Sequence, residues 1–417
     1  MSVDSPQAME RIPANFLAHP YELFEKLRAE GAACRVVMPH GVAVWMVTRY
    51  DDVRMLLNDS RISKDGRRMD EMYVRHSGRE VGDDESVETG FDDNLTMHML
   101  NADPPLHTRL RAQVSKAFTL SSMKRLRPRI EQVTDQLLDA MDGQDVVDLV
   151  TAFAAPLPLI LICELFGIPA EDQHDIERWS TRLIGSGHPA DEVAEAGLKF
   201  SAYAEKLIES RRAHPGDDLV SELVQITDAD DGRLSQDELV AMIFVLVAAG
   251  LDTPMRQLGL AVYTLLTHPE ELAKLRADLS IMPTAVDELM RFDGTVATAS
   301  FRFAAADITL GEVTIPAGEM VLLSLASANR DSSHFEDPGR LDVHRRLLGN
   351  LSLGHGPHYC IGAHLAKQEI EVGLSRLITR YPDLRLAVDP KELRWENGNL
   401  LRCLIELPVR VSPLDQP

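Results

Sequence analysis

The sequence predicts a mainly α-helical fold that carries small β-sheets at its edges. Apolar residues recur at helical spacings of three and four almost continuously over residues 106–292, and again over about 361–380. Runs of β-type residues are confined to two regions, residues 34–48 and residues 296–323. No short-period repeat and no Gly/Ser-rich linker divides the chain. We therefore expect residues 1–417 to form a single domain.

The N-terminal elements are predicted to be a short helix and then a hairpin. Residues from Tyr21 to Glu30 have helical spacing, and two β-type runs at residues 35–38 and 42–47 flank a turn at His40 and Gly41. Residues 65–103 are polar and acidic and predict a long loop, a kind of segment that is often functional. Residues 331–360 lack regular periodicity, and short strands are expected to end the chain.

Charge and cysteine content exclude several classes of protein. The formal net charge is −22, whereas a nucleic-acid-binding protein needs a basic surface. The four cysteines include no Cys-x-x-Cys pair, which argues against a zinc site or a redox dithiol. The first ten residues contain no apolar signal-peptide core, and the apolar run at 241–251 is shorter than the ~20 residues that span a bilayer. We expect a soluble, cytoplasmic protein that binds neither nucleic acid nor membrane.

A long central helix is predicted to begin at Ser235. Ser235 and Glu238 have the spacing of a capping box, in which each side chain bonds the backbone amide of the other residue. The helical pattern then runs to about His268, so the helix would be roughly 50 Å long at ~1.5 Å per residue. A helix of that length must cross the middle of the fold.

The middle of this helix contains a chemically distinctive run from Ala249 to Pro254. Pro254 has no amide hydrogen and its ring clashes with the carbonyl of Gly250, which predicts a kinked, locally opened helix. Thr253 can bond the carbonyl of Ala249 and loosen the turn further. The kink would present an acid, Asp252, and an alcohol, Thr253. A tolerated kink with Asp252 facing water is the alternative that this run leaves open.

One cysteine, Cys360, stands where its chemistry would be activated. Gly354, Gly356 and Pro357 precede it on a loop, Gly362 follows it, and a helical pattern then begins. Amides at a helix N-terminus favour negative charge, and the thiolate form of cysteine is the one that ligates metals or attacks carbon. Cys360 is therefore a candidate metal ligand or nucleophile.

Three further sets of charged residues have both a functional and a structural interpretation. His107 and Arg111, at i and i+4 on one helix face, could bind a carboxylate or could form a solvated basic face. Glu288 and Arg291, at i and i+3, have the spacing of surface ion pairs that contribute only ~0.2–0.5 kcal/mol each. The basic stretch at residues 109–129 suggests a docking patch for an acidic partner, unless neighbouring acids neutralise it.

Taken together, these residues resemble the cytochrome P-450 (P450) superfamily of haem-thiolate monooxygenases, over nearly the whole chain from about residue 21 to 411. The family's haem loop, Phe-Gly-x-Gly-x-His-x-Cys-x-Gly, is matched by Gly354, Gly356, His358, Cys360 and Gly362. Its oxygen-binding motif, Ala-Gly-x-Asp/Glu-Thr, is matched by Ala249, Gly250, Asp252 and Thr253. Its Glu-x-x-Arg motif is matched by Glu288 and Arg291, and Arg340 resembles the usual third partner. The chain looks like soluble bacterial class I members, especially actinobacterial enzymes that tailor macrolides and other secondary metabolites.

The resemblance implies a role for each of these residues. Cys360 would be the axial thiolate ligand of the iron in haem b. Asp252 and Thr253 would relay protons to bound dioxygen. The other cofactor-binding residues that it implies are Ala249, Gly250, Gly354 and Gly362, with His107, Arg111, Arg302 and His358 gripping the haem propionates. Glu288, Arg291 and Arg340 would form a structural network, and the basic stretch would dock a ferredoxin that a ferredoxin reductase supplies with electrons.

The resemblance also implies a substrate pocket. Its walls would be the loop near 80–98, helix positions 181–200, central-helix residues 244, 245, 248 and 249, and segments 295–299 and 399–401. These side chains are mostly small or aliphatic, so we expect a bulky, largely apolar natural product that is hydroxylated, epoxidised or oxidatively coupled. Four residues depart from the family's pattern. Leu353 replaces the usual aromatic of the haem loop, His364 stands where proline is frequent, Lys367 stands where arginine is frequent, and Pro254 directly follows Thr253.

Two other functions compete with this one. Cys360 and His358 could be the nucleophile and base of a hydrolase or transferase, but side chains at i and i+2 on an extended loop point to opposite sides. A haem protein that only senses or carries a ligand is the second alternative. The presence of both Asp252 and Thr253 argues against it, because such a protein needs no proton relay.

Overall fold

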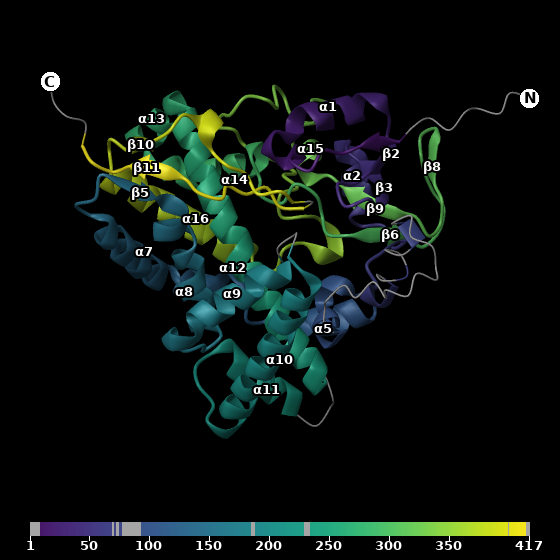
Figure 1. Ribbon diagram of the computed structural model, residues 1–417, viewed down its shortest axis with the longest axis horizontal. Coiled ribbons are helices and arrows are strands. Elements are labelled where there is room, and N and C mark those ends of the chain that lie inside the picture. Colours follow the sequence, from purple (N-terminus) through teal and green to yellow (C-terminus); the bar gives the residue numbers. More distant parts are fainter. Residues whose placement is uncertain are drawn as a thin grey trace, which may run out of the picture.

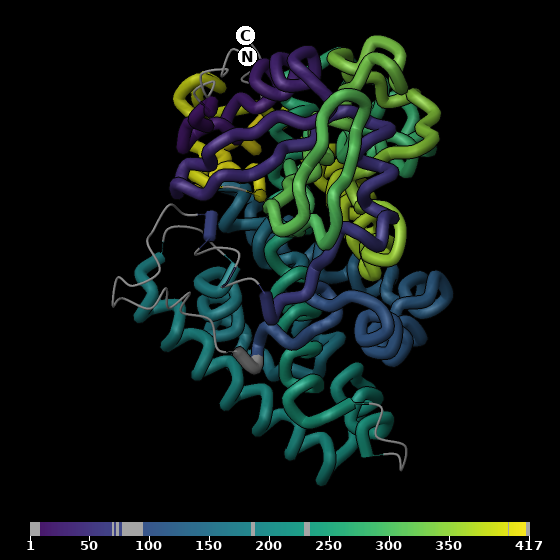
Figure 2. Tube along the Cα trace, turned by 90° about the vertical axis from the view of Figure 1, so that its right-hand side faces the viewer, coloured from purple at the N-terminus to yellow at the C-terminus, as the bar shows by residue number. Residues whose placement is uncertain are grey.

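The computed structural model describes residues 9–68, 71, 75–76, 93–184, 188–228, 234–398 and 400–413. Figure 1 shows helices filling the left and lower parts of the molecule and the largest sheet at the upper right. Figure 2 shows the same division from the side, with the strands gathered above and teal helices below. The predicted mainly α fold with small sheets is confirmed.

The helices account for most of the described chain between residues 106 and 292, as the periodicity predicted. They are α1 (Pro20–Glu30), α2 (Tyr50–Leu56), α4 (Asp93–Thr96), α5 (Leu106–Val114), α6 (Leu120–Arg125), α7 (Arg127–Met141), α8 (Pro156–Leu165), α9 (Gln173–Ile184), α10 (Ala190–Ala213), α11 (Leu219–Asp228), α12 (Gln236–Thr267), α13 (Pro269–Ala277), α14 (Met282–Phe292), α15 (Leu325–Ala328) and α16 (Ala363–Arg380). One strand that the sequence did not predict, β5 (Val146–Asp148), interrupts this region. It pairs with β11 (Pro408–Arg410), which also pairs with β10 (Arg385–Leu386).

The largest sheet has six strands in the order β1, β2, β3, β9, β6, β4. Their bounds are β1 (Glu10–Arg11), β2 (Ala33–Val37), β3 (Ala43–Val47), β9 (Met320–Leu323), β6 (Arg302–Ala304) and β4 (Ile62–Ser63), and β7 (Ile308–Leu310) and β8 (Val313–Ile315) form a separate hairpin. The predicted N-terminal hairpin is β2–β3, with Gly41 at a φ of 93° in its turn. The antiparallel pairing of β4 with β6 sets Ser63 opposite Phe303. The next residue pair along the two strands is Lys64 and Arg302, so the sheet brings two distant cations together.

Helix α12 has the predicted start and length. Its capping box is present: the Ser235 hydroxyl accepts from the Glu238 amide at 3.1 Å, and the Ser235 amide donates to Glu238 Oε2 at 3.0 Å. The helix is unbroken through Pro254, in contrast to the locally opened turn that the sequence predicted. Burial of Leu251 and Leu258 on either side holds the backbone in place, while the Thr253 hydroxyl bonds the Ala249 carbonyl at 2.7 Å.

By length and hydropathy α12 could cross a membrane, but 72% of its apolar window is buried inside the protein. This is the expected position of a core helix, because a helix that is apolar on all sides must be covered on all sides. Helices α8, α9 and α16 pack against it. The largest hydrophobic cluster lies in this helical region, and two smaller clusters lie around the six-stranded sheet.

Candidate functional site

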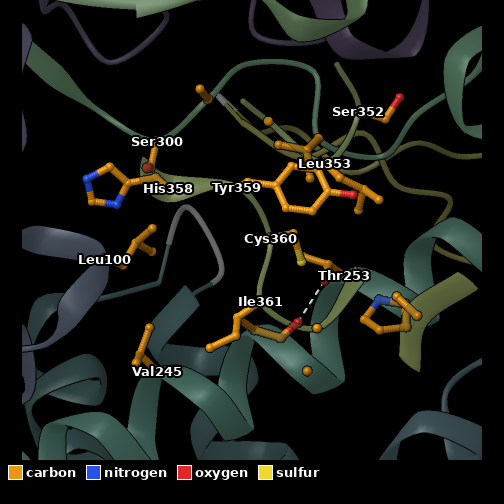
Figure 3. A pocket seen from close by; sticks show the side chains of 18 of the residues that line it. Leu100, Val245, Thr253, Ser300, Ser352, Leu353, His358, Tyr359, Cys360 and Ile361 are labelled. Carbon is orange, nitrogen blue, oxygen red and sulfur yellow. Dashed lines mark hydrogen bonds between the residues drawn. The ribbon is translucent and has the colours of Figure 1, made fainter. Parts of the chain in front are cut away.

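A cavity lies where α12, the cysteine loop and the start of α16 meet the strand β6. It contains about 1500 Å³ of space between atoms, including the solvent at its mouth. Figure 3 shows Cys360 and Thr253 close together on one side and His358 and Ser300 on the other. Most lining residues are apolar, and the site residues among them are Ala249, Gly250, Thr253, Arg302, Gly354, His358, Cys360, Gly362, His107 and Arg111. All the sequence-predicted site residues except Asp252 therefore line one cavity.

The backbone of the cysteine loop is shaped by two glycines. Gly354 and Gly356 have φ angles of 75° and 73°, which L side chains rarely adopt. A side chain at Gly356 would also lie within 2.9 Å of the backbone oxygen of Leu57. The loop then closes with a bond of 2.9 Å from the Cys360 amide to the Leu353 carbonyl.

The Cys360 thiol lines the cavity just before α16 begins. Burial raises the pKa of this thiol, while the Gly362 amide and the charge of Arg111 favour the thiolate. The stabilisation of the thiolate by backbone amides at the start of the helix, which the sequence predicted, is therefore present. Burial opposes it, because burial favours the neutral thiol. Within the described residues no group of three His, Cys, Asp or Glu side chains could hold a metal ion. A metal at Cys360 would have to bring most of its ligands with it, as a porphyrin does.

Five cationic or imidazole side chains line the cavity. We call them the open cluster: Lys64, His107, Arg111, Arg302 and His358. Lys64 Nζ donates to Ser300 Oγ at 2.6 Å, and Arg302 donates to the Ser300 carbonyl at 2.7 Å. Burial lowers the pKa of Lys64 well below its ordinary value and that of Arg302 to about 10. No carboxylate of the described residues forms an ion pair with any of the five.

The two histidines complete the open cluster. The rings of His107 and His358 lie 4.2 Å apart between centroids. His107 Nε2 is buried without a hydrogen-bond partner in the part of the chain that is described. Arg111 donates to the Tyr359 carbonyl at 2.6 Å, which ties α5 to the cysteine loop.

Haem fits these residues. Buried cations without a counter-charge are costly, and a buried imidazole nitrogen without a partner adds to that cost. Haem has an apolar ring, which suits the apolar walls, and two carboxylates, which would pair with the open cluster. The same geometry disfavours a Cys–His catalytic pair, because the His358 ring packs against His107 and points away from Cys360 in Figure 3.

On α12 the acid and the alcohol of the oxygen-binding motif are separated. Thr253 lines the cavity, whereas Asp252 does not and is only 1% exposed. Asp252 Oδ2 lies 2.9 Å from Arg256 Nε, and Arg256 also contacts Glu396. Burial raises the pKa of Asp252, and the Arg256 charge lowers it. The alternative of a water-facing Asp252 is wrong, but the carboxylate is not in the cavity either.

Gly250 lets a neighbouring helix approach α12 closely. A side chain at this position would lie 2.7 Å from the Cδ1 atom of Ile162, on α8. The space left by the missing side chain of Gly250 is therefore taken up by the protein itself.

The Glu-x-x-Arg motif forms a fully buried ion pair. Arg291 donates to both oxygens of Glu288, at 2.6 and 2.7 Å. The predicted third partner, Arg340, is wrong: its side chain is 60% exposed and pairs with Asp337 and Asp342.

The actual third partner is Arg345, which is 13% exposed and donates to Glu288 at 3.1 Å. Arg340 contributes only its backbone carbonyl, which accepts from Arg345 at 3.1 Å and from Arg291 at 3.4 Å. We call Glu288, Arg291 and Arg345 the closed cluster.

The basic stretch at 109–129 is neutralised in part. Arg109 pairs with Glu238, Arg127 with Glu131 and Glu371, and Arg129 with Glu164. Its exposed cations without an ion pair to any described residue are Lys116, Lys124 and Arg125. Neutralisation by neighbouring acids therefore applies to Arg109, Arg127 and Arg129. The interpretation as a docking patch stays open for Lys116, Lys124 and Arg125.

The substrate walls were predicted in part. Val245, Ala249 and residues 295, 296 and 299 line the cavity. Phe244, Ala248 and the described residues of 181–200 do not line it. Residues 80–92 and 399 lie outside the described residues, so that part of the prediction stays open.

Sequence reasoning missed two charged residues of the cavity, Lys64 and Glu369. No motif marks Lys64, because its place depends on the pairing of β4 with β6. Glu369 could have been noticed, because it lies among apolar residues of the predicted helix after Cys360.

Comparison with known proteins agrees with this geometry. The family model for cytochrome P450 matches residues 179–396. The chain is 41% identical over 395 residues to cytochrome P450 107B1 of Saccharopolyspora erythraea, covering 95% of this chain and 96% of that protein. It is 40% identical over 399 residues to 6-deoxyerythronolide B hydroxylase of the same organism, covering 94% of this chain and 96% of that protein.

Solved structures show the same relationship. The tirandamycin C-bound P450 monooxygenase TamI superposes with a TM-score of 0.87 at 40% identity, covering 97% of this chain and 100% of that one. Such coverage includes the cysteine loop, α12 and the open cluster together. The chain therefore belongs to the cytochrome P450 family and is a P450 monooxygenase, for which the family implies a thiolate-ligated haem.

Proposed function

We propose that the protein inserts one atom of dioxygen into a bulky, largely apolar natural-product intermediate. Each turnover consumes the substrate, dioxygen, two electrons and two protons, and yields the oxygenated product and water. The observation that carries the proposal is the cavity itself, which is lined by Cys360, by Thr253, by five cationic or imidazole groups and otherwise mostly by apolar side chains. The whole chain, 1–417, would act as one domain.

The residues of the cavity have distinct roles in this proposal. Cys360 would hold the haem iron, and the open cluster would hold the haem carboxylates. The haem, when bound, supplies the chemistry that activates dioxygen. The Thr253 hydroxyl donates its proton to the Ala249 carbonyl, so its oxygen is left to accept a hydrogen bond in the cavity, and it would give up its proton only after it turns away from that carbonyl. Asp252 could resupply that proton only after it leaves Arg256.

The names of the relatives support the substrate class. One relative is a 6-deoxyerythronolide B hydroxylase, and the TamI structure contains tirandamycin C. The described walls of this cavity are apolar at Leu100, Val245 and Val296. Apolar walls exclude water and reward an apolar substrate by ~25 cal/mol per Å² of buried surface.

The electron donor would be a ferredoxin, itself reduced by a ferredoxin reductase, in the cytoplasm. Lys116, Lys124 and Arg125 are exposed and unneutralised by described residues, in a chain whose net charge is −22. The negative charge of the whole chain would repel an acidic electron carrier. The three exposed cations would attract the carrier to this part of the surface.

The test is a binding screen followed by turnover. Purified haem-bound protein is titrated with candidate metabolites, and we expect bulky, largely apolar compounds to change the haem spectrum by displacing the water ligand of the iron. Those compounds are then incubated with ¹⁸O-labelled dioxygen and a ferredoxin system, and the product should gain one labelled oxygen atom. A screen in which only small molecules change the spectrum contradicts the substrate class, and an unlabelled product contradicts the reaction.

A further inference from the structure

A buried amide side chain on α12 lines the cavity and has no role in the function proposed above. Gln257 lies one helix turn after Thr253 and is 3% exposed. Both residues line the cavity, and side chains at i and i+4 share one face of a helix. About 6 Å of helix rise separates the two positions, so a group that Gln257 holds lies close to Thr253.

Gln257 binds the backbone of residues 293–296, which we call the wall segment. Its Oε1 atom accepts from the Thr295 amide at 2.9 Å, and its Nε2 atom donates to the Asp293 carbonyl at 3.2 Å. These two partners have opposite polarity, so together they fix the orientation of the side-chain amide. Thr295 and Val296 of the wall segment line the cavity. Gln257 therefore joins one wall of the cavity to the helix that carries Thr253.

The wall segment lies between α14 and β6 and belongs to neither, so side chains satisfy much of its backbone. Both hydrogen bonds that α12 makes to this backbone, among the residues described, come from Gln257. On the other side Arg402 holds the segment: its amide donates to the Thr295 carbonyl at 2.7 Å, and its side chain pairs with Asp293 at 2.7 Å. A buried backbone amide without a partner is costly, so loss of Gln257 would release the segment on the α12 side alone.

We propose that Gln257 is a positioning residue that decides which part of the substrate is presented for oxygenation. It holds the wall segment against α12 and so sets the place of Val296, an apolar wall residue, relative to Thr253. Both groups of its amide are engaged by backbone, so Gln257 acts through the wall and moves no proton itself. A displaced wall changes the orientation of a bulky ligand and leaves every reacting group in place. This proposal rests on the proposed function, because only a substrate that is oxygenated in this cavity has an orientation to set.

The first test needs no substrate. Residue-resolved hydrogen exchange of the haem-bound protein should show a protected Thr295 amide in the wild type, because that amide is bonded to Gln257. Gln257→Met keeps the length of the side chain but removes both bonds, and it should speed exchange at Thr295 by about tenfold or more. An unprotected Thr295 amide in the wild type overturns the proposal, and so does unchanged protection in Gln257→Met.

Thr264→Val is the matched control for this test. Thr264 is also buried on α12, but it does not line the cavity and bonds the carboxylate of Asp293 instead of the backbone of the wall segment. Exchange at Thr295 should therefore stay as in the wild type. Faster exchange at Thr295 in this control as well would show that any polar loss on α12 loosens the wall, which contradicts a specific role for Gln257.

The second test uses turnover with a substrate that the wild type oxidises, and measures the ratio of the main product to its isomers. Gln257→Met should retain the haem but change this ratio by roughly 2–10-fold, the range that a lost hydrogen bond carries. Gln257→Glu can still accept from the Thr295 amide but cannot donate to the Asp293 carbonyl, so it should change the ratio less. Thr264→Val should keep the wild-type ratio.

The outcomes separate this proposal from the proposed function. A wild-type ratio in both Gln257 variants contradicts the positioning role. If Gln257→Met does not fold, an unchanged ratio in Gln257→Glu contradicts it equally. A wild type that oxidises nothing contradicts the proposed function instead.

Discussion

The closed and open clusters are both buried groups of charge near the cysteine loop, but they are satisfied in different ways. In the closed cluster Glu288 receives three donated bonds from Arg291 and Arg345. In the open cluster the hydrogen bonds of Lys64 and Arg302 to described residues are to the hydroxyl and the carbonyl of Ser300, and the charge of Asp103 acts on both cations without forming an ion pair. Because a buried charge needs a partner, the closed cluster is suited to hold the fold together and the open one to bind an anion. The difference separates residues for stability from residues for the cofactor, although both sets are arginine-rich.

The largest effect is expected when the closed cluster is broken. Arg291→Leu leaves the buried Glu288 carboxylate with Arg345 and the Asp342 amide on one oxygen and no described donor on the other. It should lower the free energy of unfolding by about 3–5 kcal/mol. Chemical denaturation of the haem-bound protein measures it. Arg340→Leu is the matched control and should change stability by less than about 0.5 kcal/mol, because that side chain lies at the surface. Equal losses in the two variants would contradict the reassignment of the third partner.

The sequence predicted the pair in this cluster but not its third member. Glu288 and Arg291 are adjacent on one helix turn, so their contact is local and follows from spacing. Arg340 and Arg345 both lie in a segment without α-helix or strand, and only the tertiary path of residues 331–360 decides which one turns inward. Sequence spacing carries no information about that choice.

The same reason explains the other successes and failures. The capping box, the β2–β3 turn and the face shared by His107 and Arg111 are local, and each was predicted. Lys64 reaches the cavity only through its pairing with a strand 240 positions away, which no local pattern reveals. The motif predicted that Asp252 would lie in the cavity beside Thr253. Its carboxylate instead pairs with Arg256, one helix turn further along. That i, i+4 pair could have been noticed in the sequence.

A smaller effect is expected when the open cluster is changed, and it concerns retention of the haem instead of stability of the fold. Arg302→Leu should leave the haem-free protein as stable as the wild type or more so, since it removes a buried cation without an ion partner. Haem should be lost about 10–100 times faster, since a charged hydrogen bond contributes ~1.5–3 kcal/mol. Transfer of haem to an acceptor globin measures the rate. Lys26→Leu, which removes an exposed cation, is the control. If haem-free Arg302→Leu instead unfolds as easily as Arg291→Leu, the two clusters do not differ in function.

The smallest effect concerns pH beside the open cluster. His98 is buried, and burial with the nearby charge of Lys64 lowers its pKa to about 3. The unfolded chain takes up this proton at pH of about 6.5, so stability is fully present above that pH and is lost between about 6.5 and 3. Between pH 6.5 and pH 5.5 the loss is about 1 kcal/mol.

Comparison of variants isolates this contribution. His98→Gln should flatten the dependence of unfolding free energy on pH in that range. Lys64→Met removes a charge that lowers the His98 pKa, so it should move the lower end of the range to higher pH. His174→Gln, at an exposed position, should leave the curve of the wild type unchanged. A curve that keeps its full slope in His98→Gln would show that another group dominates.

The central claim is that the Cys360 thiolate binds the iron of a haem whose carboxylates the open cluster holds. The carbon monoxide complex of the reduced protein tests it most directly. We predict the red-shifted Soret band of thiolate ligation in the wild type, and in Cys360→Ser a protein that still binds haem but lacks the shift. An unshifted band in the wild type, or a shifted band in Cys360→Ser, would contradict the claim.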